Sequence, residues 1–72
     1  MERNSQDLGL VAGANLKRLI KEAGMTQLDF ADDFGTDDRN VRRWISKGIY
    51  NLHIIQDIAD FFGIDVFDIL SA

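Results

Sequence analysis

Apolar residues recur every three or four positions along most of the chain, which is the spacing of an amphipathic helix. The first such segment runs from Leu8 to Ala23, and Gly24 follows where a helix would end. Gly9 and Gly13 weaken the first turns, so a start later than Leu8 stays open. The segment predicts one amphipathic helix.

Two shorter helices are predicted next, with a turn at Gly35 between them. Thr26 is a good N-cap for the first, and Asp29 places a negative charge near its positive end. Asp37 is the candidate N-cap of the second, which runs from Asp38 through Ile45. The inward face of this helix is predicted to be Val41, Trp44 and Ile45, and its outward face Asp38, Arg39, Arg42 and Arg43.

A fourth helix is predicted after Asn51, which can cap it, and Gly63 ends it. Asp65 then caps a last turn or two from Val66 to Leu70. The chain has no proline, no strand-like alternation and no internal repeat. The predicted fold class is therefore all-α, with five short helices.

The length and composition are those of one small globular domain. The chain has 72 residues, of which 46% are hydrophobic and 28% charged. We expect a single domain over residues 1–72, with residues 1–7 flexible. No cysteine is present for a disulfide or a thiolate metal site, no apolar run would span a bilayer, and the N-terminus has no signal-peptide pattern. These features predict a cytoplasmic module with no membrane partner.

The net charge of −4 argues against a nucleic-acid partner until its distribution is considered. From Arg39 to Lys47 there are four basic residues and no acid. From Leu52 to the end there are four aspartates and no lysine or arginine. The basic charge is therefore concentrated on the third predicted helix and the loop after it.

Four sequence runs carry a family resemblance: MTQLDFA at 25–31, FG at 34–35, VRRW at 41–44 and IADFFGI at 58–64. Together they resemble the Cro/repressor helix-turn-helix family, the lambda-repressor-like domains, over about Ala12 to Leu70. The resemblance implies a compact five-helix domain with its helix-turn-helix in the second and third helices. It also implies a bacterial or phage-encoded regulator, most simply a repressor, that binds the major groove of double-stranded DNA as a homodimer.

The resemblance implies a set of DNA-contacting residues. Arg39 or Arg42 would read guanine, because bidentate arginine is the commonest specific contact to that base. Asp38 would accept a hydrogen bond from cytosine, or orient Arg42 four residues on, or simply stabilise the helix start. The alternative is that the basic residues form an ordinary solvated face. The full predicted set is Gln27, Asp38, Arg39, Asn40, Arg42, Arg43 and Lys47, with Gln27 and Lys47 at phosphates.

On each of the last two predicted helices, some apolar residues do not fit on a single buried face. These residues are Ile54, Phe61, Phe67 and Leu70. We interpret them as a C-terminal homodimer surface. The alternative is that helices packed on two sides need more apolar residues. A second hypothesis for the whole protein is a protein-interaction module, antitoxin-like or an adaptor, whose acidic and apolar C-terminal face binds a protein partner.

Other chemistry has little support in the sequence. The acids Asp29, Asp32, Asp33, Asp37 and Asp38 lack the spacing of a calcium loop, so we interpret them as caps and solvated helix ends. His53 is the sole histidine and is expected on the surface of the fourth helix. No catalytic arrangement has a credible pocket in so short a chain, so neither an enzyme nor a cofactor or metal is expected.

Overall fold

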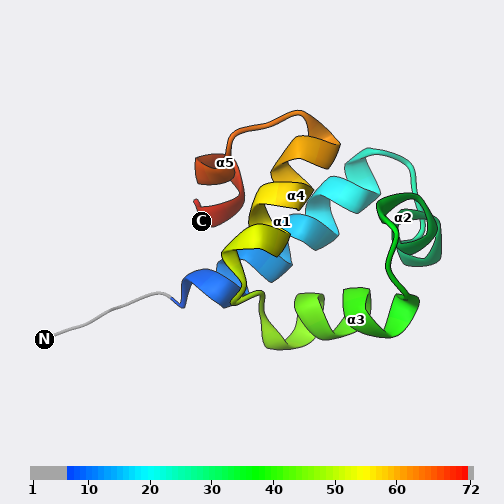
Figure 1. Cartoon of the computed structure of the whole chain (residues 1–72), viewed down its shortest axis with the longest axis horizontal. Coiled ribbons are helices and arrows are strands. Elements are labelled where there is room, and N and C mark those ends of the chain that lie inside the picture. The colour runs from blue at the N-terminus through cyan, green and yellow to red at the C-terminus, as the bar shows by residue number, and fades with distance from the viewer. Residues whose placement is uncertain (1–6, 72) are drawn as a thin grey trace, which may run out of the picture.

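Five helices follow one another along the chain, and the computed structural model describes residues 7–71 (Figure 1). Among these residues there is no strand, so the predicted all-α fold is confirmed. No helix of this part is long and apolar enough to cross a membrane. The helices are α1 (Leu8–Glu22), α2 (Gln27–Phe34), α3 (Asp38–Lys47), α4 (Leu52–Phe62) and α5 (Val66–Leu70).

A side chain caps the N-terminus of every helix. Four of these caps are the predicted ones, and α3 extends two residues beyond the predicted Ile45. The cap of α1 is Asp7, whose Oδ1 accepts hydrogen bonds from the N–H groups of Gly9 at 3.0 Å and Leu10 at 3.3 Å. Asp7 therefore starts α1 at Leu8 despite the early glycines. The flexible segment was expected at residues 1–7; apart from Asp7, it lies outside the described residues.

Helix α1 packs closely on α3 because it has a glycine at the contact. A Cβ atom at Gly13 would overlap the carbonyl oxygen of Trp44 and lie 3.2 Å from that of Ile45. Gly13 has no positive φ, so the close approach of the two backbones, and not backbone conformation, requires glycine there. The residue that weakens α1 locally is the one that lets α3 reach it.

The core receives side chains from all five helices. Leu16, Phe30, Val41, Ile58 and Ile69, one from each helix, are fully buried. The Phe30 ring stands at the centre of an aromatic cluster, with ring centroids 5.0 to 5.6 Å from three other phenylalanines. Packing of this kind adds to the stability of a domain too small for a large core. The three neighbours are Phe34, Phe61 and Phe62.

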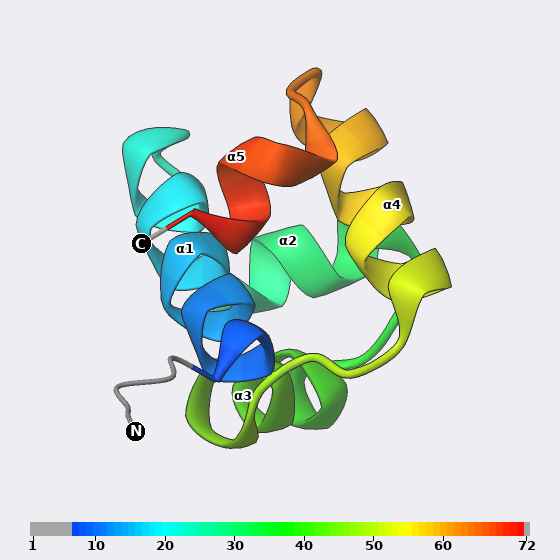
Figure 2. The same ribbon diagram turned by 90° about the vertical axis from the view of Figure 1, so that its left-hand side faces the viewer.

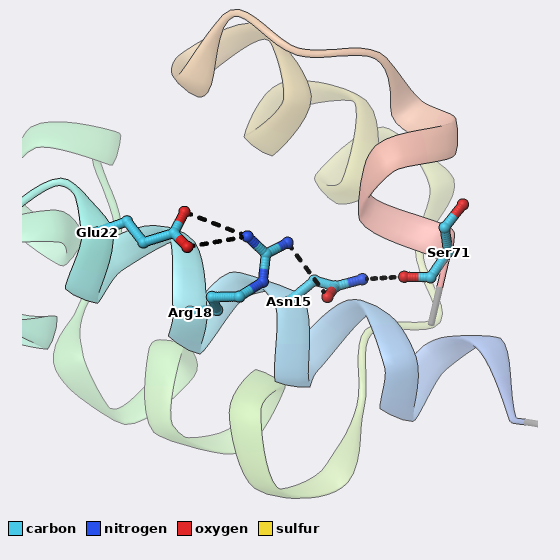
Figure 3. A network of polar contacts seen from close by, with 4 residues as sticks. All are labelled: Asn15, Arg18, Glu22 and Ser71. Atoms are coloured by element: carbon cyan, nitrogen blue, oxygen red, sulfur yellow. Dashed lines mark hydrogen bonds and ion pairs between the residues drawn. The ribbon is translucent and has the colours of Figure 1, made fainter.

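Side chains of α1 hold the C-terminal end of the described chain (Figure 3). The Asn15 Nδ2 donates to the carbonyl oxygens of Ile69 at 2.6 Å and Ser71 at 2.8 Å. Arg18 donates to the Asn15 Oδ1 at 3.4 Å and pairs with Glu22 at 3.2 Å. These contacts fix α5 against α1, while α3 lies on the opposite, lower edge of the molecule in both views (Figures 1 and 2).

Candidate nucleic-acid interface

A short turn joins α2 to α3. Gly35 has a φ of +90°, a left-handed conformation that favours glycine, and its N–H and that of Thr36 both donate to the Ala31 carbonyl. The next residue, Asp37, caps α3 through the N–H of Asn40 at 2.8 Å. The turn is therefore defined by local chemistry, and it sets the direction in which α3 leaves α2.

Helix α3 has one buried face and one basic, exposed face. Val41 is fully buried and Trp44 is 8% exposed, which confirms their predicted core positions. The four basic side chains are exposed; helical spacing predicted this for the three arginines, whereas Lys47 was expected in the following loop and lies in the last turn of α3. They are Arg39, Arg42, Arg43 and Lys47.

Among the exposed basic residues of α3, Arg42 differs from the others because it is ion-paired. Its Nε lies 3.1 Å from the Asp38 Oδ2, one turn earlier on the same helix. No carboxylate of residues 7–71 pairs with Arg39, Arg43 or Lys47. The orienting role considered for Asp38 therefore has a geometric basis, and Arg39 is the less constrained of the two candidate base-reading arginines.

Asn40 and Gln27 lie at the start of the two helices. The Asn40 Nδ2 donates to the Thr36 Oγ1 at 3.0 Å, so this side chain is engaged with the turn. Gln27 is partly exposed as the first residue of α2. Asn40 belongs to α3 and Gln27 to α2, and their contacts with DNA stay predictions.

The loop after α3 is tied to the start of α1. The Ile49 N–H donates to the Gly9 carbonyl at 2.9 Å, and the Tyr50 hydroxyl donates to the Asp7 carboxylate, also at 2.9 Å. This hydrogen bond raises the pKa of Tyr50, with slight desolvation of the hydroxyl and the nearby negative charge adding to the effect. The tie holds the C-terminal end of α3, and with it Lys47, against the rest of the domain. Tyr50 was missed at the sequence level because its partner lies 43 residues away.

The comparison with protein families settles which domain this is. The model of the Cro/C1-type HTH DNA-binding domain matches residues 15–72. The chain belongs to this family. The resemblance drawn from the helix-turn-helix residues is thus confirmed, and a Cro/C1-type domain is a DNA-binding domain by family.

A solved structure shares the fold of this Cro/C1-type domain. It is the solution structure of the SOS-response transcriptional repressor LexA from Eubacterium rectale, with a TM-score of 0.78 and 23% sequence identity. The alignment covers 96% of this chain and 74% of that one. No curated protein shows significant similarity in sequence.

The predicted dimer residues of the Cro/C1-type domain differ in exposure. Phe67 on α5 is 75% exposed, whereas Phe61 on α4 is 37% exposed and contacts the aromatic cluster. Ile54 and Leu70 are partly buried against the core. Packing on two sides of α4 and α5 therefore explains why part of this set is apolar. It does not explain Phe67, whose side chain is exposed.

The acids beside the helix-turn-helix of the Cro/C1-type domain include helix caps, as interpreted from the sequence. The Asp29 carboxylate accepts the Thr26 N–H at 3.1 Å in a capping box, and Asp37 caps α3. Asp38 pairs with Arg42. His53 is exposed on α4, in the place predicted for it.

Proposed function

We propose that this Cro/C1-type domain is a sequence-specific transcriptional repressor of a bacterium or phage, without catalytic activity, that acts in the cytoplasm by occupying an operator. The observation that carries the proposal is the orientation of α3. Its apolar side chains anchor it in the core, and its basic side chains extend from the edge of the molecule. An α-helix presented in this way fits the major groove of double-stranded DNA.

The residues of α3 divide into two roles under this proposal. Arg39, near the N-terminal end of the helix and without a carboxylate partner in the described chain, reads a guanine. Arg42 is held by Asp38 and contacts a neighbouring base. The remaining members of the predicted set position the domain, chiefly on phosphates. These are Gln27, Asn40, Arg43 and Lys47.

Arg39→Ala is expected to weaken binding to a site selected from a random DNA pool by about 5- to 150-fold, corresponding to about 1–3 kcal/mol, and to relax preference at one base pair. Arg18→Ala removes the same charge from α1, beside the C-terminal end of the described chain, and should leave the affinity nearly unchanged. Fluorescence anisotropy titrations at several salt concentrations measure the affinity of both variants for the selected site.

Two outcomes of that experiment contradict the proposal. One is a flat dependence of affinity on salt, because phosphate contacts release counterions and require a steep negative slope. The other is a selected site that the Arg39→Ala variant binds as tightly as the wild type.

We further propose that the domain binds a pseudo-palindromic operator as a homodimer, with Phe67 at the contact and Leu70 as a less exposed member. Of the other two residues of the predicted surface, Ile54 packs against the core and Phe61 belongs to the aromatic cluster, and both stay outside the contact. Phe67→Ala is expected to reduce the cooperativity of binding to two half-sites. Because Phe67 is 75% exposed, the free energy of unfolding should change by about 0.5 kcal/mol or less. Leu52→Ala, at a 73% exposed position on α4, is the control. Equal cooperativity in both variants, measured by electrophoretic mobility shift, would remove Phe67 from the interface.

A further inference from the structure

A groove of about 590 Å³ opens between the end of α2, the buried side of α3 and one face of α4. Aromatic side chains from all three helices line it, and aspartates on α2 and α4 stand beside them. The aromatic members are Phe34, Trp44 and Phe61, and the acidic members are Asp33, Asp57 and Asp60.

The aromatic part of the groove is held rigidly by mutual packing. The Phe34 ring meets Trp44 edge-on at a centroid distance of 6.0 Å and Phe61 at 5.9 Å. Phe61 is 37% exposed, so part of this apolar surface is accessible. Trp44 also lines the groove, although it is only 8% exposed. The groove therefore offers aromatic ring surface.

The charge of the groove is of one sign. No lysine, arginine or histidine lines it, and its three aspartates form no ion pair within residues 7–71. All three are exposed, so the carboxylates stand at the rim of the groove. Such a surface repels the phosphates of DNA and attracts a cationic group.

We propose that this groove is a docking site for a partner protein, which inserts an arginine or lysine between the aspartates and over the aromatic rings. A guanidinium group suits the site best, because it pairs with carboxylates and stacks on ring faces at once. A small ligand needs most of its surface enclosed, whereas a groove with an exposed rim accepts a side chain whose backbone remains outside. The chemistry of the rim therefore specifies a basic segment of a protein.

This binding would be a function beyond operator recognition. Among the proposed DNA-contacting residues, Asn40 lines the groove and Arg39, Arg42 and Arg43 do not. A partner seated there would contact the turn of the helix-turn-helix and leave the basic face of α3 free for DNA. The partner would therefore join a DNA-bound domain without competing for the base-reading residues.

The test is a selection of peptides from a random displayed library on the full chain, followed by titration of the enriched peptides against three variants. Enriched peptides should carry arginine or lysine beside an apolar residue. Asp57→Asn and Asp60→Asn should each weaken binding about five-fold. Asp32→Asn, the same charge change on α2 outside the groove, should leave the affinity unchanged.

Three results would overturn the proposal: no enrichment, enrichment of sequences without a basic residue, or equal binding by the groove variants and the Asp32→Asn control. Both groove positions are exposed, so the substitutions should leave the fold intact, and circular dichroism of each variant checks this directly. The outcome is independent of operator binding, since a domain that selects no DNA can still select basic peptides.

Discussion

Gly13→Ala is expected to destabilise the domain by about 2 kcal/mol or more, although alanine is the better helix former by about 1 kcal/mol. The added Cβ would overlap the Trp44 carbonyl oxygen, which is backbone and cannot rotate away. Relief requires α1 and α3 to separate, and this separation would also move the proposed DNA-reading helix. Urea unfolding followed by circular dichroism measures the stability, and the same protein can be titrated with the selected DNA.

Gly9→Ala is the matched control, one turn earlier on the same helix. A Cβ there meets the ring of Tyr50, which is a side chain and is 68% exposed, so it can move aside at the cost of its hydrogen bond to Asp7. We expect the Gly9→Ala variant to lose clearly less stability than Gly13→Ala. Equal losses would show that the effect comes from helix propensity, or from a sensitivity of α1 to any substitution, and not from the backbone contact with α3.

Phe30→Ala is expected to cost about 3–5 kcal/mol of unfolding free energy. Phe30 is fully buried and its ring contacts three other phenylalanines, so the substitution removes the centre of the aromatic cluster and leaves a cavity. A domain of this length has a total stability of about 4–10 kcal/mol, so the substitution would remove a large part of the free energy of unfolding. Thermal unfolding by calorimetry measures the loss.

Leu28→Ala serves as the control on the same helix, because Leu28 is 57% exposed. Its effect should stay within about 0.5 kcal/mol. A Phe30→Ala loss as small as that of Leu28→Ala would mean that the cluster contributes little, and that the contacts of α1 with α3 and α5 hold the domain together.

The helix boundaries were predictable because they depend on neighbouring residues. Thr26, Asp37, Asn51 and Asp65 each cap a helix by accepting an N–H two or three residues away, which is visible in a linear sequence. The basic face of α3 was predictable for the same reason, since helical periodicity decides which residues share a side.

The candidate groove and the start of α1 were not predictable in this way. Asp7 was placed in the flexible segment because Gly9 and Gly13 weaken the first turns of α1, although its capping partners are only two and three residues away. Its contact with Tyr50, 43 residues away, appears only in the folded chain. The groove unites Asp33 with Asp57 and Asp60 only after α4 packs beside α2. Ile54 and Phe61, interpreted as dimer residues from their excess over one stripe, line that groove instead of projecting freely.

The sequence by itself determined the number and type of the helices, their caps, the family and the basic face of α3, because each follows from local spacing and chemistry. The tertiary structure decided what Gly13 does, which of the two candidate base-reading arginines pairs with Asp38 in the described chain, and how aspartates of two helices come to share one groove. These features depend on the distance between elements, and that distance is set by packing in three dimensions, which no local pattern records.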